Sequence, residues 1–429
     1  YQVFKYLGLM DKLKLQKMDE DVFDKIIIEN DDKEYVYAQG YENFIQQLLK
    51  DFPNEEKALR TYCDKIKEVC SKFPLYNLRS GGDINEKTPV LEIDAQAYIE
   101  SITTDKKLQA VLAGNNTLYA GKGGMTPLYV HAMILNSYIE SSWKCIDGGS
   151  AIGKYMVQNI REHAGDIRRN AEVKRIVVEN GKVGSVELKD GSFITAKYFI
   201  SNMHPVRTLE MTETKIIKPA YRSRVKDLEN TVSSFIVNIV FDKEAFPYLK
   251  HNYYYHKEGQ VWNMTEYTEE NWPLGYALFF SASSRSDVFA ESMTILAYMK
   301  FDEVKQWTDT FNTVSDEVDR GKDYEAFKKR KAELLIDLVE EKFPGLRKAI
   351  KSYYTATPLS YRDYIGNDDG SMYGIAKDYR NPLKTFISPR TKVPNLYLTG
   401  QNLNLHGILG ATMSGLVTCT AFLGNEKII

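Results

Sequence analysis

The sequence predicts an α/β protein of two domains that are built from interleaved segments. Three observations lead to this prediction. The chain has 429 residues, which is too many for a single hydrophobic core. A helical segment followed by three strand-like runs occupies residues 147–201. A strand, a glycine-rich loop and a helix then follow one another over residues 395–422.

The first 140 residues are predicted to be mainly helical. Apolar residues recur at helical spacing over residues 41–52, and a second helical pattern runs over residues 54–70. Cys63 and Cys70 are seven residues apart in this second pattern and are predicted to share its packed face. Residues 35–37 are expected to form a short strand. These helices are interpreted as packing elements.

Residues 147–201 carry the clearest local signals. A turn at 147–150 opens a helix that Gly165 ends. Three β-rich runs follow at 173–179, 183–189 and 193–201, separated by Asn-Gly at 180–181 and by Asp-Gly at 190–191. Both dipeptides are strong hairpin signals. A helix followed by a three-stranded meander is therefore expected.

Residues 205–300 are predicted to alternate strand-like and loop-like pieces. Strand-like runs occur at 233–241, 253–255, 276–281 and 293–299. An amphipathic helix is expected over 325–342, and the Phe-Pro-Gly sequence at 343–345 ends it.

The chain ends in a pattern that suits a bound nucleotide. A strand at 395–400 ends in Gly400, and Gly407, Gly410 and Gly415 accompany the start of the final helix. Glycine lets backbone N–H groups approach a ligand, and a helix N-terminus attracts phosphate. The spacing is not Gly-x-Gly-x-x-Gly, and a tightly packed strand–helix crossover would give the same pattern. The nearby meander favours the nucleotide interpretation.

Several motifs, taken in order, resemble those of the phytoene desaturase, carotenoid isomerase and retinol saturase superfamily. They lie at 147–149, 170–173, 190–191 and 199–202. Residues 40–45, 357–374 and 395–415 are most similar to the retinol saturase branch. The resemblance implies an α/β FAD/NAD(P)-binding Rossmann-like domain over 145–205 and 375–429, and a substrate domain with a mixed sheet and a helical subregion over 11–144 and 206–374.

This resemblance also implies FAD as the redox carrier. The substrate would be an apolar polyene or isoprenoid, and the reaction would be desaturation, saturation or isomerisation of carbon–carbon double bonds. The residues that match the cofactor-binding positions are Val173, Gly400, Gln401, Asn402, Gly407, Ile408, Gly410, Ala411 and Thr412.

Two departures from the family pattern affect the cofactor. The family begins with a strand and Gly-x-Gly-x-x-Gly, whereas this sequence starts at Tyr1 with residues that match the family's interior. We expect the fingerprint to precede this sequence; a protein without it should bind FAD poorly. Gln401 also stands where many relatives have Asp, so its contact with the ribityl chain should be weaker.

Candidates for direct chemistry are few. His406 lies beside the glycine loop, and Tyr364 and Tyr373 could face a cavity, but a backbone-bonded histidine and core tyrosines would look the same. Residues 126–127 resemble a family segment near the substrate mouth. Two other functions fit the sequence: an amine-oxidase-like flavoenzyme, and a flavin-free lipid-binding remnant.

Composition limits the partners. The net charge of −2 argues against nucleic acid, and neither the four cysteines nor the six histidines have metal-ligand spacing. Without a long apolar run, a cytoplasmic protein is expected. Peripheral membrane association is a further hypothesis, and the oligomeric state is open. The candidate membrane surface lies within 95–145 and includes Tyr129, Ile134, Leu135, Tyr138 and Trp143.

Overall fold

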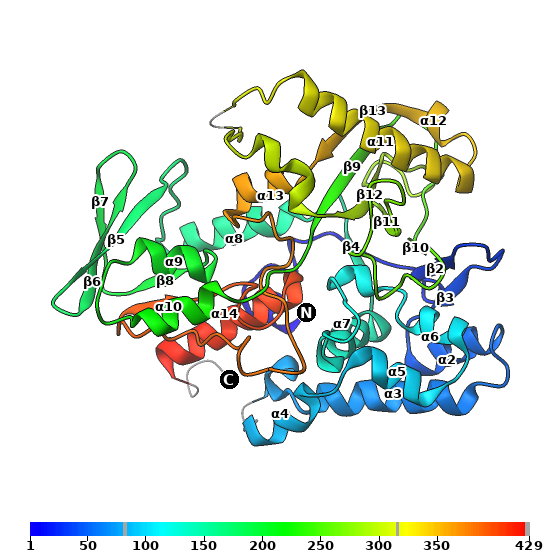
Figure 1. Ribbon diagram of the computed structural model, residues 1–429, viewed down its shortest axis with the longest axis horizontal. Coiled ribbons are helices and arrows are strands. Elements are labelled where there is room, and N and C mark those ends of the chain that lie inside the picture. Colours follow the sequence, from blue (N-terminus) through cyan, green and yellow to red (C-terminus); the bar gives the residue numbers. More distant parts are fainter. Residues whose placement is uncertain (80–83, 315–316, 425–429) are drawn as a thin grey trace.

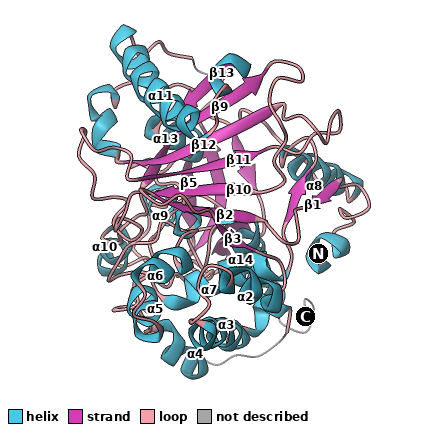
Figure 2. Ribbon diagram, turned by 90° about the vertical axis from the view of Figure 1, so that its right-hand side faces the viewer, coloured by secondary structure: helices cyan, strands magenta, loops and turns pink. Residues whose placement is uncertain are grey.

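A seven-stranded mixed sheet forms the centre of the larger part of the molecule. The computed structural model describes residues 1–79, 84–314 and 317–424. The strand order is β13–β9–β12–β11–β10–β2–β3, and all neighbours are antiparallel except β10 and β2 (Figure 2). The strands are β2 (Asp24–Ile28), β3 (Tyr35–Tyr37), β9 (Ser233–Phe241), β10 (Asn252–His256), β11 (Gly275–Phe280), β12 (Ser292–Met299) and β13 (Ile350–Ala356).

Helix α11 (Lys322–Lys342) covers one face of this sheet, in agreement with its predicted amphipathic pattern. Its Leu335 and Ile336 are buried against the inward residues of β9, such as Val237. The four predicted strands of this region are confirmed as β9 to β12. The expectation of a mainly helical N-terminal region missed β2, because a short apolar run does not distinguish a buried strand from a helix.

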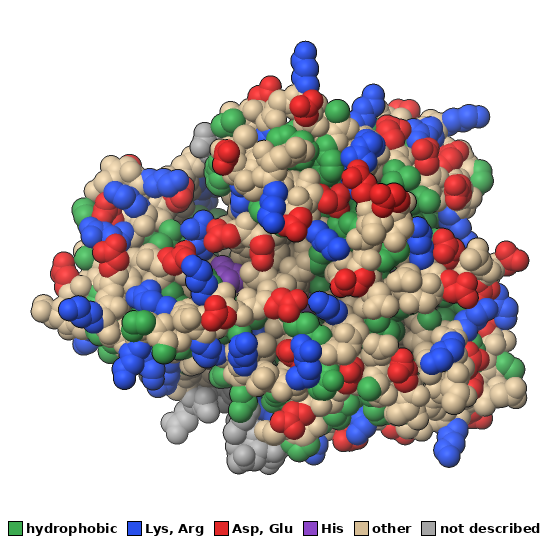
Figure 3. Space-filling view, in the orientation of Figure 1, with side chains coloured by type: hydrophobic (Ala, Val, Ile, Leu, Met, Phe, Trp, Pro, Cys, Tyr) green, Lys and Arg blue, Asp and Glu red, His purple; other side chains and the backbone are tan. Residues whose placement is uncertain are grey.

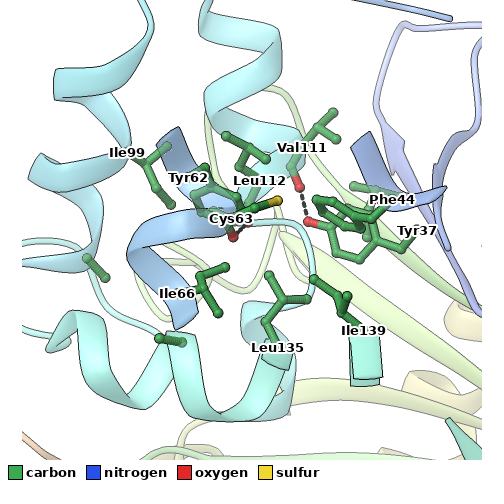
Figure 4. Close-up of a cluster of buried hydrophobic side chains, with 14 of the residues drawn as sticks. Tyr37, Phe44, Tyr62, Cys63, Ile66, Ile99, Val111, Leu112, Leu135 and Ile139 are labelled. Atoms are coloured by element: carbon green, nitrogen blue, oxygen red, sulfur yellow. Dashed lines mark hydrogen bonds between the residues drawn. The ribbon is translucent and has the colours of Figure 1, made fainter. Parts of the chain in front are cut away.

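A group of helices packs against the other face at the β10–β2–β3 end of the sheet (Figure 2). Figure 4 shows its core, in which the hydroxyl of Tyr37 donates to the carbonyl oxygen of Val111. Cys63 and Cys70 are both buried here, as their shared face predicted. The helices are α2 (Tyr41–Leu49), α3 (Glu56–Ser71), α4 (Ile84–Leu91), α5 (Ala95–Ile102), α6 (Lys106–Leu112) and α7 (Leu128–Glu140).

The membrane surface predicted within residues 95–145 is wrong for most of its members. Leu135 of α7 is fully buried and lies in the core shown in Figure 4. Tyr129, Ile134 and Tyr138 pack against the same core, because α7 is enclosed by its neighbours. Trp143 alone of the five is exposed. No helix in the described part of the chain is long and apolar enough to cross a bilayer.

The smaller part of the molecule contains the meander, at the left of Figure 1. Strands β5 (Val173–Glu179), β6 (Lys182–Leu188) and β7 (Phe193–Thr195) form it. The third predicted run, 193–201, is not one strand. It divides, and β8 (Phe199–Ser201) leaves the meander to pair in parallel with β14 (Leu396–Leu398).

Asn395 connects the meander to β14. Its side-chain amide donates to the carbonyl oxygens of Val183 and Lys197, at 2.9 and 3.1 Å, and its Oδ1 accepts from the N–H of Val183 at 2.8 Å. A shared core joins Ile176 and Leu396 to Leu209 of α9 (Pro205–Met211) and Val225 of α10 (Pro219–Lys226). The two pieces of the predicted nucleotide domain therefore lie together.

The remaining elements connect these parts. These elements are α1 (Gln2–Tyr6), β1 (Leu15–Lys17), η1 (Pro74–Asn77), η2 (Asn116–Leu118), β4 (Trp143–Cys145), α8 (Ser150–Glu162), η3 (Phe301–Trp307), α12 (Leu346–Ala349), α13 (Pro358–Ile365) and α14 (Gly407–Leu423). Helix α8 agrees with the helix predicted after the turn at 147–150.

Candidate cofactor and substrate site

The carboxyl ends of two parallel strands define the site. Leu398 of β14 pairs with Ser201 of β8, and the N–H of Thr399 donates to the carbonyl oxygen of Ser201 at 2.9 Å. Beyond this pair, the segment after β8 turns into α9, and the segment after β14 runs through the glycine loop into α14. Ligands of open α/β sheets bind at such an edge, where helices begin after the strands.

Gly400 is required where the loop leaves β14. Its φ of 98° lies in the region that L side chains rarely adopt. A Cβ atom built on it would lie 2.0 Å from Oδ1 of Asn202, the residue after β8. The glycine therefore lets the two strand ends approach each other at the floor of the site.

The first turn of α14 is open toward its surroundings. His406 is the N-cap residue, and its side chain makes no capping hydrogen bond. Gly407 has a φ of 70°, and a Cβ there would meet nothing within 4 Å, while Ile408 is 60% exposed. N–H groups at a helix start bind the oxygens of phosphates and carbonyls, so the turn suits a flavin nucleotide.

A polar cavity of about 250 Å³ lies between the glycine loop and the larger part of the molecule. Gln401 and His406 reach it from the loop, and Thr126 and Pro127 from the segment predicted to lie near the substrate mouth. Its other lining residues are Tyr119, Ala120, Lys122, Met125, Val130, Glu229, Asn230, Thr231, Val232, Thr265, Glu266, Lys300, Tyr373, Ile375, Ala376, Lys377, Asn404 and Leu405.

His406 and Tyr373 form one wall of the polar cavity. Their rings stack with centroids 4.1 Å apart and an interplanar angle of 22°. Nε2 of His406 lies 2.8 Å from the carbonyl oxygen of Leu118, to which it donates. Burial, together with the charge of the nearby Lys377, lowers the pKa of His406 to about 4, although the hydrogen bond to Leu118 raises it. The imidazole is therefore neutral near pH 7, with Nδ1 as its acceptor.

An apolar cavity of about 370 Å³ adjoins the polar one. Lys377, Asn404 and Leu405 line both cavities, so the two meet at these residues. The remaining lining residues of the apolar cavity are Phe73, Leu75, Tyr76, Lys87, Leu91, Tyr129, Met133, Pro382, Leu383, Thr385, Phe386, Leu403, Leu409, Met413 and Val417.

Four other predicted cofactor residues do not line either cavity. Val173 begins β5, and Gly410 is buried against the backbone of Leu405. Ala411 is exposed on α14, and the hydroxyl of Thr412 donates to the carbonyl oxygen of Ile408.

Asn402, predicted to bind the cofactor, and Tyr364, a candidate for direct chemistry, have other contacts in the structure. The side chain of Asn402 is buried, and its Oδ1 accepts from the N–H of Ile375 at 3.1 Å. Tyr364 is 61% exposed on α13, and its hydroxyl accepts from the N–H of Val314. Neither residue lines the two cavities.

Three residues at the site were missed by sequence reasoning: Lys377, Asn395 and Asn202. Each is a single polar residue in a loop, and a lone polar residue has no periodic signal. Asn202 and Asn395 lie within the family-like segments 199–202 and 395–415, but only the pairing of β8 with β14 reveals their contacts. No cluster of three or more His, Cys, Asp or Glu in the described ranges is suited to a metal ion.

The parallel strand pair, the glycine loop, the open start of α14 and the meander together are typical of a flavoprotein oxidoreductase. The profile of flavin containing amine oxidoreductases matches residues 1–423, and the chain belongs to this family.

Relatives with assigned names support the same class. All-trans-retinol 13,14-reductase of Danio rerio is 25% identical over 452 residues, which cover 95% of this chain and 73% of the relative. Prolycopene isomerase of Daucus carota is 26% identical over 433 residues, covering 90% of this chain and 64% of the relative. In fold, the chain is similar to cyclohexylamine oxidase of Brevibacterium oxydans, with a TM-score of 0.57, 11% identity and coverage of 99% and 85% of the two chains.

Proposed function

We propose that this protein is an FAD-dependent oxidoreductase that acts on carbon–carbon double bonds of an apolar polyene or isoprenoid-like substrate. The observation that carries the proposal is the apolar cavity, which adjoins the polar cavity beside the glycine loop. The retinol reductase and prolycopene isomerase relatives support the substrate class.

The residues around the glycine loop suit FAD. The N–H groups of Gly407 and Ile408 would hold oxygens of the cofactor, and Gln401 would donate to or accept from its hydroxyl groups. Bound FAD would supply reversible hydride transfer. The paired wall of His406 and Tyr373 would limit the space beside the loop and exclude water from it.

The charges of the polar cavity argue against an amine substrate. Its lining includes three lysines (Lys122, Lys300 and Lys377) but only two carboxylates (Glu229 and Glu266). Lys122 also lies 3.7 Å from Glu229 and neutralises it. An ammonium substrate would face a net positive lining, whereas a neutral polyene would not.

Flavin reduction under anaerobic conditions tests the proposal. The protein is loaded with FAD, and the flavin absorbance is followed after addition of a polyene such as a dihydro-retinoid or phytoene, or of a primary amine. We expect bleaching by the polyene, or polyene saturation by chemically reduced enzyme, and no reaction with the amine. Bleaching by the amine alone would establish the amine oxidase function. A full-length protein that stays colourless with added FAD would favour the lipid-binding function.

We also propose that the protein associates peripherally with membranes through the entrance of the apolar cavity. Leu383 and Phe386 line this cavity and are 62% and 51% exposed. Figure 3 shows Lys and Arg side chains gathered at the lower left, over α10. Four cations near Leu383 form no salt bridge with a described carboxylate, and they are Arg224, Lys384, Arg390 and Lys392. Apolar side chains among cations suit an anionic bilayer surface.

A further inference from the structure

The apolar cavity is lined along one helix by an apolar stripe that suits a chain-like ligand. Leu409, Met413 and Val417 line it at intervals of four residues and so form one stripe along α14. Tyr129 and Met133 of α7 also line it. Its volume of about 370 Å³ falls within the range of small-molecule sites.

The charged side chains that line the apolar cavity, among the described residues, are all positive. Among its described lining residues, Lys87 and Lys377 carry charge, and none is Asp or Glu. A neutral hydrocarbon would need no charge at all, and a cationic amphiphile would be repelled. An apolar chain with an anionic end fits both the lining and its charge.

Lys377 lies where such an anionic end would meet the cofactor side. Its Nζ donates to the carbonyl oxygens of Thr385, Asn402 and Leu403, at 3.2, 3.4 and 3.2 Å. In the described ranges, no carboxylate lies within ion-pair distance of it. By contrast, the buried Lys331 is paired with Glu303 at 2.6 Å.

An enclosed ammonium group without a counter-ion is unfavourable, since carbonyl dipoles replace only part of its hydration. A bound anion would remove that cost. Burial lowers the pKa of Lys377 to about 8, so the group is still mainly protonated at pH 7. The side chain lines both cavities, so a carboxylate in either could replace one of its three carbonyl acceptors.

We propose that the apolar cavity binds a long-chain polyenoic carboxylate, with the carboxylate paired to the ammonium group of Lys377 and the chain along the α14 stripe. This arrangement would hold the carboxylate end at the junction of the two cavities and the rest of the chain toward Leu383 and Phe386. The binding of this carboxylate does not depend on the proposed function. The further step, that the bound carboxylate is the substrate of the enzyme, rests on the proposed function.

Equilibrium binding tests the inference without any turnover. The probes are cis-parinaric acid, a fluorescent conjugated polyenoic acid, and the alcohol obtained by reducing its carboxyl group. Flavin-loaded protein is titrated with each probe. We expect the acid to bind at least about tenfold more tightly than the alcohol, which corresponds to one charge-assisted contact. Equal affinities in the unsubstituted protein would overturn the inference, whatever any variant does.

Three variants assign the contact. Lys377→Met keeps an apolar side chain of similar length and should remove the preference for the acid while leaving alcohol affinity within about twofold. Lys377→Arg should retain part of the preference. Lys122→Met, which neutralises a cation of the polar cavity only, should keep all of it. A preference that survives Lys377→Met but disappears in Lys87→Met would place the carboxylate elsewhere and overturn the inference.

Failure here and failure of the proposed function give different results. Loss of the acid preference, with flavin still reduced by a neutral polyene, refutes only the carboxylate site. Tight, Lys377-dependent acid binding without any flavin reduction supports the site and refutes the redox function.

Discussion

The substitution Gly410→Ala tests how the start of α14 is held against the glycine loop. Gly410 is buried, and a Cβ atom there would lie 2.2 Å from the carbonyl carbon of Leu405 and 2.3 Å from its oxygen. Both are backbone atoms, so no change of rotamer can relieve the contact. The helix and the loop would have to separate by about 1 Å to reach ordinary van der Waals distance.

The loss of unfolding free energy in Gly410→Ala can be worked out from this contact. Forcing a methyl group into a packed site destabilises a protein by about 1–3 kcal/mol. Replacing a helical glycine by alanine returns up to about 1 kcal/mol. Gly415→Ala is the matched control, because Gly415 lies in the same helix and a Cβ there would meet nothing within 4 Å. The two variants should therefore differ in unfolding free energy by about 1–3 kcal/mol.

Two measurements test whether the Gly410 contact holds the start of α14 and whether that helix start holds FAD. Urea unfolding gives the stability of each variant, and quenching of flavin fluorescence gives its affinity for FAD. A displacement of the helix start moves the N–H groups of Gly407 and Ile408, so Gly410→Ala should weaken FAD binding by at least about tenfold, equivalent to one lost charge-assisted hydrogen bond. If Gly410→Ala is destabilised but binds FAD as well as Gly415→Ala does, the helix start does not hold the cofactor. If the two variants are equally stable, the packing argument is wrong.

Three further predictions follow. Asn395→Ala should destabilise the protein by about 2–3 kcal/mol in urea unfolding, since it leaves buried groups of Val183 without partners; an unchanged unfolding midpoint would contradict this. The double variant Lys384→Glu with Phe386→Ser should float with anionic vesicles at least about fivefold less, and should lose less flotation on neutral vesicles, where only the apolar contact of Phe386 is removed; unchanged flotation on anionic vesicles would remove this membrane surface. Because the folded pKa of Lys377, about 8, is below its ordinary value of 10.5, the folded state binds fewer protons than the unfolded state, and this group adds up to about 3 kcal/mol of stability as the pH rises from about 8 to 10.5. The unfolding free energy of the unsubstituted protein should therefore rise relative to that of Lys377→Met over that range, and a constant difference would contradict the low pKa.

Local sequence signals predicted most elements but not how they join. The hairpin dipeptides at 180–181 and 190–191 mark the meander turns, and their left-handed residues, Asn180 and Gly181 among them, bear this out. The division of 193–201 into β7 and β8 could not be predicted, because the pairing of β8 with β14 spans about half the chain. Alternation along one strand carries no information about a partner so distant in sequence.

The chain has 29 tyrosines, and the structure places several of them in two kinds of environment. Tyr35, Tyr62 and Tyr254 are among the largest fully buried side chains and belong to the core of the larger part. Tyr373 and Tyr129 instead line the polar and apolar cavities. Composition could not separate these groups, because a tyrosine lining a cavity and one in the core have the same helical or strand periodicity. Their distinction depends on the space left between elements.

The glycine loop is joined directly to the segment that carries Tyr373 and Lys377. A Cβ on Gly374 would lie 2.2 Å from Oδ1 of Asn402, which accepts the N–H of Ile375, so the segment after Tyr373 is fixed directly to the loop. Lys377 then bonds the carbonyl oxygens of Asn402 and Leu403 in that same loop. One unit therefore supports the start of α14, the wall of the polar cavity and the inner end of the apolar cavity. A ligand that pairs with Lys377 would act on the carbonyl groups holding the cofactor loop, so its binding should alter the absorbance spectrum of bound flavin even where no electrons are transferred.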